Sequence, residues 1–205
     1  MNYLIIGGNS DIAKDVITRL LDDGHHVHCL IRNIEQKDAL TSRGITVTVG
    51  DATSEDDMKQ CIADAKEQGD INGLLHCVGS IVIRPPHALN KDAFEEVITT
   101  NLTSAFLALS IAGKAMLRQG KGRMVFSSSV AGSLGLVNHE AIAAAKGGIE
   151  AMVRASAATY ARRGLRINAV APGLTDTKMA SKILSSDAMR ETAAQKIPTL
   201  SLIHI

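Results

Sequence analysis

The sequence predicts an α/β protein in which a doubly wound parallel sheet is covered by helices on both faces, in three layers. Short runs rich in Val, Ile and Leu alternate with longer amphipathic stretches, which is typical of strand–helix–strand units. Glycines stand just beyond helical stretches and before the next strand, where a left-handed cap ends a helix; these are Gly24, Gly44, Gly69 and Gly164. The 205 residues carry no Pro/Gly/Ser-rich linker, so we expect one domain.

The expected strands are apolar runs such as NYLIIG, HVHCLI and MVFSS. They occupy residues 2–7, 26–31, 45–49, 73–78, 123–128 and 166–171. The stretches between them are long enough for helices, which we place at residues 11–23, 34–43, 54–68, 90–118 (broken near Asn101) and 140–163. Ligands of such sheets bind at the carboxyl ends of the strands, so the residues that follow each strand are the candidates for function.

Composition argues against several classes of function. Apolar residues make up 45% and charged residues 21% of the chain, no apolar run approaches the length of a bilayer, and the first residues show no basic leader. We therefore expect a cytoplasmic protein without a membrane partner. A formal net charge of +1 gives no reason to expect nucleic acid as a partner. Three cysteines at wide spacing argue against a disulfide framework and suit a reducing compartment.

The HHVH run contains three histidines, His25, His26 and His28. It could place two imidazoles on one strand face, as a metal site needs. Because no third or fourth ligand lies nearby in the sequence, we expect solvent-exposed histidines here and no metal site.

A phosphate-binding turn is expected after the first strand, where the chain reads IGGNSDIAKDV. A tight turn at Gly7 and Gly8 leads into a helix whose unpaired amide groups and dipole would face an anion. The residues concerned are Gly7, Asn9, Ser10, Asp11 and Ile12. Glycine turns are common and the spacing differs from the dinucleotide pattern G-x-G-x-x-G, so this motif alone leaves a plain turn and a cofactor site equally open.

Several segments, read in order, resemble the short-chain dehydrogenase/reductase family over nearly the whole chain. They are IGGNSDIA, GDATSED, HCVG, TTNLTSAF, GRMVFSSSVAGSLG and RINAVAPGLTDTKM. The family's opening motif, TGxxxGxG, keeps its first glycine as Gly7 but has Asp11 at the second and Ala13 at the third. An aspartate beside a pyrophosphate is repulsive unless its side chain turns away. The resemblance implies a single Rossmann-type domain.

The resemblance also implies that the cofactor is NADP(H) rather than NAD(H). Ile31 stands where an NAD-preferring member carries an acid, and the following Arg32 can pair with the 2′-phosphate through charge-assisted hydrogen bonds. The alternative is a surface arginine at a strand end. Asp51, with Ala52 beside it, matches the family aspartate that contacts the adenine, although it could also be a plain acid at a helix N-terminus.

Two further segments complete the cofactor site that the family implies. HCVG stands where members have Asn-Asn-Ala-Gly, so Cys77, Val78 and Gly79 would lie against the cofactor, with Cys77 as inert filling rather than a reactive thiol. The segment that closes over the nicotinamide matches at Pro172, Gly173, Leu174 and Thr177.

The family's catalytic residues find counterparts here, with one exception. Asn101 corresponds to the asparagine that interrupts a helix and holds a relay water, Ser129 to the serine that polarises the carbonyl, and Lys146 to the lysine that holds the nicotinamide ribose. The proton-transferring tyrosine precedes that lysine by four residues, on the same helix face, and here this position is Ile142. Neither of the chain's tyrosines, Tyr3 and Tyr160, can substitute for it.

A different proton donor is therefore expected. His139 lies three residues before Ile142, on a side of the chain that family members use to line the substrate pocket, and imidazole is the commonest general acid–base group. A polar pocket wall or an exposed histidine is the alternative. Glu140 is the second candidate, unless it only complements the helix dipole, and solvent is the third.

We thus expect an oxidoreductase that interconverts a small ketone or aldehyde with an alcohol by hydride transfer. The alternatives are a non-catalytic dinucleotide-binding subunit or sensor and, last, a structural domain without a dinucleotide. Family members pack through helices that here span about 103–118 and 142–163, which implies a homo-dimer or homo-tetramer. The tail LSLIHI looks like a translated sequencing adapter, so we expect residues 1–199 to form the domain, without the family's final helix and strand, and 200–205 to be non-native.

Overall fold

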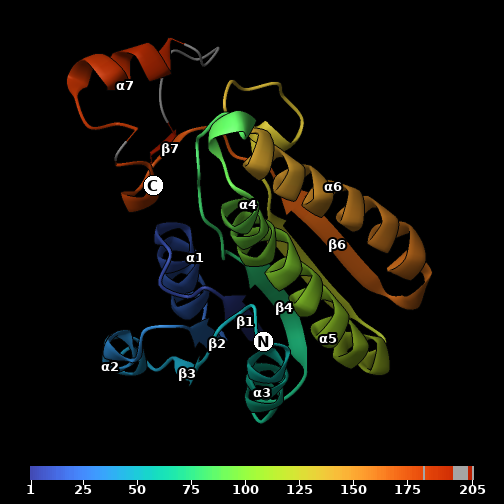
Figure 1. Ribbon diagram of the computed structural model, residues 1–205. Coiled ribbons are helices and arrows are strands. Elements are labelled where there is room, and N and C mark those ends of the chain that lie inside the picture. Colours follow the sequence, from blue (N-terminus) through green and yellow to red (C-terminus); the bar gives the residue numbers. More distant parts are fainter. Residues whose placement is uncertain (182, 196–202, 205) are drawn as a thin grey trace.

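The computed structural model describes residues 1–181, 183–195 and 203–204. Within them lies a six-stranded parallel sheet with the strand order β3-β2-β1-β4-β5-β6 (Figure 1). Its strands are β1 (Asn2–Ile6), β2 (His26–Ile31), β3 (Thr46–Val49), β4 (Ile71–His76), β5 (Gly122–Ser127) and β6 (Leu165–Val170). The strand order reverses between β1 and β4, which creates a ligand-binding crevice at their carboxyl ends. The doubly wound fold expected from the sequence is confirmed.

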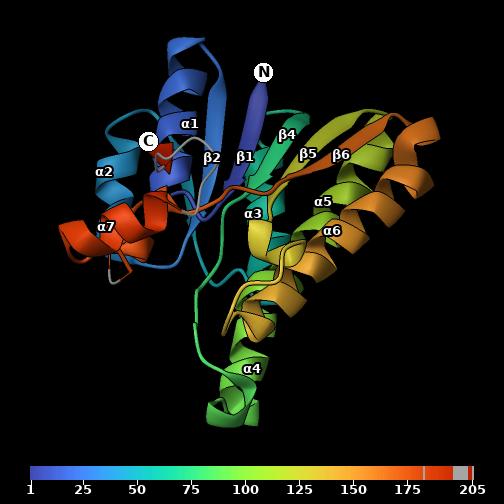
Figure 2. The same ribbon diagram turned by 90° about the horizontal axis from the view of Figure 1, so that it is seen from above.

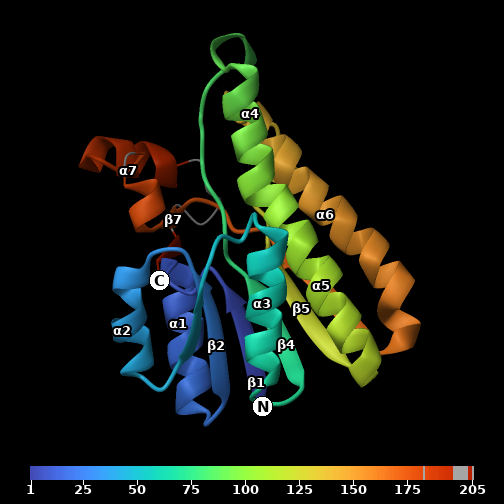
Figure 3. The ribbon, with the colours of Figure 1, turned by 60° about the horizontal axis from the view of Figure 1, so that its bottom comes forward.

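Helices cover both faces of the sheet. The helices α1 (Asp11–Asp22) and α2 (Lys37–Thr41) pack on one face, and α3 (Glu55–Lys66), α5 (Ser104–Gln119) and α6 (Glu140–Tyr160) pack on the other (Figures 2 and 3). Residues such as Ile5 and Ile17 pack in the core on the first face, and residues such as Phe126 and Met116 pack in the core on the second. Strand β1 is covered from both sides, so its three apolar residues are at most 1% exposed.

The expected elements agree with the structure to within two residues at every strand boundary. The four glycines expected to end helices all have positive φ angles. The helix expected at 34–43 begins as the 3-10 helix η1 (Ile34–Gln36), and the last turn of the helix expected at 140–163 is the 3-10 helix η5 (Ala161–Arg163).

The long helical stretch between β4 and β5 is interrupted as expected. Helix α4 (Lys91–Ile98) passes into a π-helical turn (Thr99–Thr103) and then into α5. The stretch Lys91–Gln119 is long enough to cross a membrane, and its mean hydropathy reaches 1.2, which is apolar enough to do so. The expectation that no apolar run approaches bilayer length is therefore wrong by this measure. Of that apolar window, 44% is buried inside the protein, and Ala108, Ala112 and Met116 pack in the core.

The HHVH run does not form a row of exposed histidines. His26 is exposed, but His28 is only 3% exposed, and its ring nitrogens lie 2.7 Å from Thr46 Oγ1 and 2.8 Å from Thr48 Oγ1. Because burial lowers the pKa of His28, its ring is neutral in this polar network, which continues from Thr48 to Asp64. In the described part of the chain no three His, Cys, Asp or Glu side chains group as a metal site.

The chain after β6 forms several short elements beside α1. They are β7 (Thr175–Asp176), the 3-10 helix η6 (Lys178–Ala180), α7 (Asp187–Ala194) and β8 (Ile203–His204), of which α7 had no counterpart among the expected helices. Strand β8 belongs to the tail expected to be non-native, and it pairs in parallel with β7. The remaining residues of that tail, 200–202 and 205, lie outside the described residues.

Candidate active site

The turn after β1 leaves no room for a side chain. Gly7 has a φ of 87°, and the Gly7 and Gly8 amides both donate to Leu30 O, at 3.0 and 3.2 Å. A Cβ atom on Gly7 would lie 3.0 Å from Val78 Cγ2 and 3.2 Å from the Cys77 carbonyl carbon. Glycine is therefore required because the turn lies directly against the end of β4.

Helix α1 begins at this turn. Ser10 is its N-cap and accepts from the Ala13 amide at 3.1 Å. Asp11 Oδ2 accepts from the Lys178 amide at 2.9 Å, and Oδ1 lies 3.1 Å from Lys14 Nζ. The hydrogen bond from Lys178 is the largest cause of the lowered pKa of Asp11. The Asp11 carboxylate is thus held by the segment after β7 and by its own helix.

The residues expected around the adenosine lie at the ends of β2 and β3. Arg32 is exposed, and the amide of Asn9 bonds to Gln36 in the neighbouring 3-10 helix η1. Asp51 Oδ1 accepts from the Thr53 amide at 2.8 Å and from the Thr53 hydroxyl at 2.7 Å. These bonds, and secondarily the charge of Arg32, hold the pKa of Asp51 below its usual value. Ala52 is buried beside them.

The chain after β4 passes between the turn and the catalytic candidates. The Cys77 amide donates to Ile6 O at 2.8 Å, and burial raises the pKa of the Cys77 thiol, which favours an inert role. Val78 lies against Gly7, as described above. A Cβ atom on Gly79 would lie 2.9 Å from Asn101 Oδ1 and 3.5 Å from Lys146 Nζ. Three elements therefore meet at Gly79, namely the end of β4, the π-helical turn and α6.

Asn101 projects from the π-helical turn and is fully buried. Its side-chain amide donates to Val97 O at 2.9 Å and to Ser80 Oγ at 3.1 Å, and its Oδ1 accepts from the Ser80 amide at 3.3 Å. The side chain is therefore fixed between its own helix and the chain after β4.

Lys146 lies in the second turn of α6 and is 7% exposed. Its Nζ donates to Ser127 O at 2.7 Å, at the last residue of β5. Burial lowers the pKa of Lys146 to about 8, and the nearby Cys77 acts weakly in the opposite direction. An ammonium group placed in this way can donate a hydrogen bond to a ligand hydroxyl.

Ser129 is the N-cap of the 3-10 helix η4 (Val130–Gly132), where its Oγ accepts from the Ala131 amide at 3.2 Å. The expected placement of Ser128 within the strand is wrong by one residue, because β5 ends at Ser127. The Val130 amide donates to Pro172 O at 3.1 Å, which joins this loop to the segment after β6. That segment also contains Gly173, Leu174 and Thr177, and all of them lie at the carboxyl edge.

Comparison with known proteins identifies this arrangement. The family model described as Enoyl-(Acyl carrier protein) reductase matches residues 7–205. The chain belongs to the short-chain dehydrogenase/reductase family. It is 33% identical over 201 residues to 2-(S)-hydroxypropyl-CoM dehydrogenase 3 of Xanthobacter autotrophicus, with 94% of this chain and 79% of that protein covered.

Two further similarities agree with this. The 3-oxoacyl-(acyl-carrier-protein) reductase MabA of Mycobacterium bovis is 32% identical over 204 residues, which cover 96% of this chain and 77% of MabA. A solved structure of an actinorhodin polyketide ketoreductase variant with NADPH has a TM-score of 0.89 at 25% identity, covering 98% and 84% of the two chains. Membership of the short-chain dehydrogenase/reductase family makes this chain an NAD(P)-dependent oxidoreductase by descent.

In this short-chain dehydrogenase/reductase, the position of the family's tyrosine lies in an apolar cluster. Ile142 is 4% exposed and packs in a cluster with Val97, Ala131 and Ala145. The partly buried apolar side chains of Val82, Leu89, Ile98 and Leu102 pack against the same cluster.

His139 and Glu140 lie at the entrance of α6. His139 is partly exposed and follows Asn138, whose φ of 62° turns the chain into the helix. Because its Nδ1 lies 2.7 Å from Val137 O, which can only accept, Nδ1 carries a proton and Nε2 is the atom that can exchange one with a substrate. Glu140 is the exposed acid of the first helical turn.

Sequence reasoning did not find several residues that shape the site. Glu150 accepts from the hydroxyls of Ser128 and Ser133, both at 2.8 Å, and so fixes the loop that carries Ser129. Its position four residues after Lys146, on the same helix face, was an available signal. Ser80 bonds to Asn101, and the Ser127 carbonyl accepts from Lys146. Both contacts join segments about 20 residues apart, for which the sequence holds no signal.

Proposed function

We propose that this chain is an NADP(H)-dependent oxidoreductase that interconverts a ketone or aldehyde with an alcohol. The observation that supports this best is the meeting of Asn101 and Lys146 at Gly79, because both side chains are buried and fixed by hydrogen bonds at the carboxyl edge of the sheet. NADP(H), when bound, supplies or accepts the hydride.

The residues present fit a dinucleotide. The turn at Gly7 lacks the Cβ that would close it, and the N-terminus of α1 beside it offers backbone amides to a pyrophosphate. Lys146 would hold the nicotinamide ribose, together with the segment from Pro172 to Thr177. Arg32, exposed near Asp51, would pair with the 2′-phosphate, which favours NADP(H) over NAD(H).

The remaining residues would act on the substrate. Ser129 Oγ accepts from the Ala131 amide, which leaves its hydroxyl proton available to donate to a carbonyl oxygen. Asn101 would hold a relay water. His139, with Nδ1–H donating to Val137 O, would give a proton from Nε2 during reduction and take one during alcohol oxidation.

The test is NADPH oxidation with a panel of small ketones and aldehydes, alongside Lys146→Ala and the exposed Lys114→Ala as a matched control. We expect Lys146→Ala to weaken NADPH binding at least about tenfold, because a charge-assisted hydrogen bond is worth roughly 1.5–3 kcal/mol. Lys114→Ala should behave as the parent. Equal affinity of Lys146→Ala and the parent would refute the site assignment.

A second candidate function is a non-catalytic dinucleotide-binding subunit or sensor. It is favoured by Ile142, an apolar residue at the position of the family's proton-transferring tyrosine. This candidate implies NADPH binding without turnover. Substitution Ile142→Tyr separates the two, because general acid catalysis typically contributes about 10²–10⁴-fold. A parent without turnover that gains it in Ile142→Tyr would support the second candidate, whereas parental turnover would support the first.

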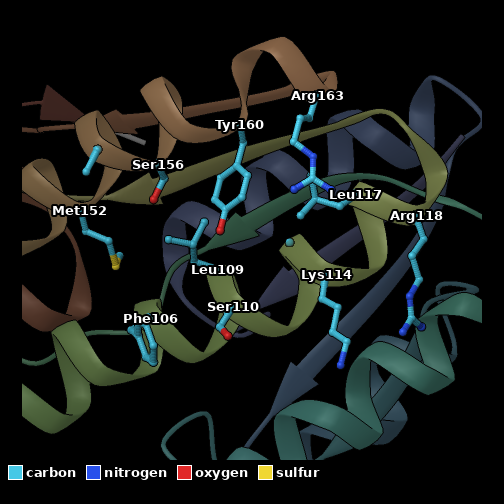
Figure 4. Close-up of a pocket in the computed structure, with 12 residues that line it drawn as sticks. Phe106, Leu109, Ser110, Lys114, Leu117, Arg118, Met152, Ser156, Tyr160 and Arg163 are labelled. Carbon is cyan, nitrogen blue, oxygen red and sulfur yellow. The ribbon is translucent and has the colours of Figure 1, made fainter.

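We also propose that the chain forms a homo-dimer or homo-tetramer in the cytoplasm. Between α5 and α6 lies a groove of about 600 Å³, with Leu109 and Met152 among its apolar lining and Tyr160 projecting from α6 toward α5 (Figure 4). A second copy packed on these helices would cover it. All three cysteines lie in the described part of the chain and are free thiols, which suits a reducing compartment.

A further inference from the structure

We propose that His76 is a positioning residue: through Ser104 it holds the π-helical turn that carries Asn101. The inference rests on the proposed function, because it concerns the same site. His76 is the last residue of β4, and its side chain is fully buried. The ring lies 5.9 Å from that of Phe126, between centroids, so it fills core space beneath α5.

The hydrogen bonds fix the direction of each proton. Ser104 Oγ donates to Thr100 O at 2.6 Å, which uses its one hydroxyl proton. His76 Nε2, 3.0 Å from the same oxygen, must therefore donate its N–H to Ser104. The His76 ring is neutral, because burial and then the charge of Lys146 lower its pKa to about 3.

The other ring nitrogen makes this arrangement costly. Nδ1 of His76 is buried and makes no hydrogen bond to another described residue. An apolar side chain of similar shape would avoid that cost. The presence of a histidine at this position is therefore explained by the hydrogen bond that its Nε2–H donates to Ser104.

The π-helical turn explains the need for that donor. In a regular α-helix the Ser104 amide would donate to Thr100 O, but here it donates to Thr99 O. The Ser104 hydroxyl serves Thr100 O instead, and His76 holds that hydroxyl in place. The same turn presents Asn101, so its shape decides where the Asn101 amide lies.

A second connection joins the same two segments. Four residues after His76, Ser80 bonds to Asn101 through its amide and its hydroxyl. The chain after β4 thus holds the turn at two points, with Gly79, Asn101 and Lys146 between them. Loss of the His76 connection would leave Asn101 attached but less well ordered relative to Lys146.

The test that is independent of activity is hydrogen exchange of the backbone amides in the π-helical turn, without cofactor. His76→Leu removes the donor and keeps apolar bulk, Ser104→Ala removes its partner, and His76→Gln keeps an N–H near the Nε2 position. We expect about tenfold faster exchange at residues 99–104 in the first two variants, and no further increase in the double variant. His76→Gln should restore most of the protection, and amides of β1 should be unaffected.

Steady-state kinetics give the functional readout. We expect kcat to fall about tenfold or more in His76→Leu and Ser104→Ala, with the Kd for NADPH changed less than about twofold. Unchanged exchange in Ser104→Ala would overturn the proposal, whether or not His76→Leu folds, and so would a His76→Gln variant no better protected than His76→Leu. A parent protein without NADPH binding would refute the proposed function, while the exchange data would still decide the role of His76.

Discussion

Asp11 stands where the family has a glycine, at the first residue of a helix whose N-terminus would receive a pyrophosphate. Its carboxylate is held by the Lys178 amide and by Lys14. We predict that Asp11→Asn tightens NADPH binding about fivefold at low salt, because it removes roughly 1 kcal/mol of repulsion and keeps the acceptor for Lys178.

Titration calorimetry at two ionic strengths would measure this effect. The gain should shrink as salt rises, since the charges are near the surface. Asp15→Asn, one turn further along α1, is the control and should leave the affinity unchanged. A weaker affinity in Asp11→Asn would show that the carboxylate itself supports the cofactor site.

The lowered pKa of Lys146 predicts that NADPH binding depends on pH. Its pKa of about 8 lies below the ordinary value of 10.5 because the side chain is buried. The ammonium form, which we propose binds the ribose, is therefore complete below pH 7 and is lost as pH rises through 8. We predict that the Kd for NADPH rises above pH 8, by at most about tenfold per pH unit. Lys146→Met should abolish this dependence, and Lys114→Met should retain it; a flat profile in the parent would contradict the prediction.

Individual residues also show how much of the candidate site could be predicted from the sequence. Gly7, Asn101, Ser129 and Lys146 could be placed because each occupies a fixed spacing in a motif. His76 and Ser104 could not, because they are 28 residues apart and meet only after β4 and α5 have packed. His28 was wrongly expected to be exposed because alternation within HHVH does not tell which face of β2 is covered by α3.

At the scale of elements, Glu150 links two segments that α6 must hold together. It accepts from Ser128 at the end of β5 and from Ser133 just after η4, so Ser129 is fixed from both sides. We predict that Glu150→Ala lowers the free energy of unfolding by about 1–2 kcal/mol, because Ser128 and Ser133 both lose their hydrogen bonds to the carboxylate and Ser128 keeps only the longer one to Lys146 O at 3.2 Å. Urea unfolding measures this, and Glu140→Ala, at the exposed start of the same helix, should cost less than about 1 kcal/mol.

This contribution depends on pH. Hydrogen bonds from Ser133 and then Ser128 hold the pKa of Glu150 below its ordinary value of 4.5. The stabilisation is therefore complete above pH 4.5 and is lost as pH falls through the lowered folded-state pKa. The difference between the parent and Glu150→Ala should shrink in acid; a constant difference would mean that the carboxylate charge is unimportant.

Strands and helices could be predicted where their burial requires regularly spaced apolar residues in the sequence. Strand β2 is buried after its first residue, strands β5 and β6 alternate buried with more exposed residues, and all six strands were located to within two residues. Helix α7 was missed because it is short and has no buried residue, and only Ala193 of the helix packs against a buried cluster. The interruption near Asn101 was expected from resemblance, but its π-helical geometry depends on the contacts of Ser104 and Ser80, which no local pattern encodes.

At the scale of the whole molecule, the strand order brings the ends of β1, β4, β5 and β6 to one edge, while α5 and α6 run side by side on one face (Figure 2). The site and the helix groove are therefore separate surfaces. The groove has an apolar floor and three basic side chains in its lining, Lys114, Arg118 and Arg163. A twofold axis that sets the helices of two copies antiparallel would keep these like charges apart.

We predict that Phe106→Glu converts the proposed oligomer to a smaller species, because Phe106 is 53% exposed in the groove and the substitution would place a charge in the proposed apolar contact. The control is Ile34→Glu, since Ile34 is 67% exposed but lies in η1, beyond β2 and away from α5 and α6. Sedimentation velocity at matched concentration distinguishes the variants. Because the basic residues of two antiparallel copies are separated, added salt should not dissociate the parent; dissociation by salt would point to charge pairing at another face instead.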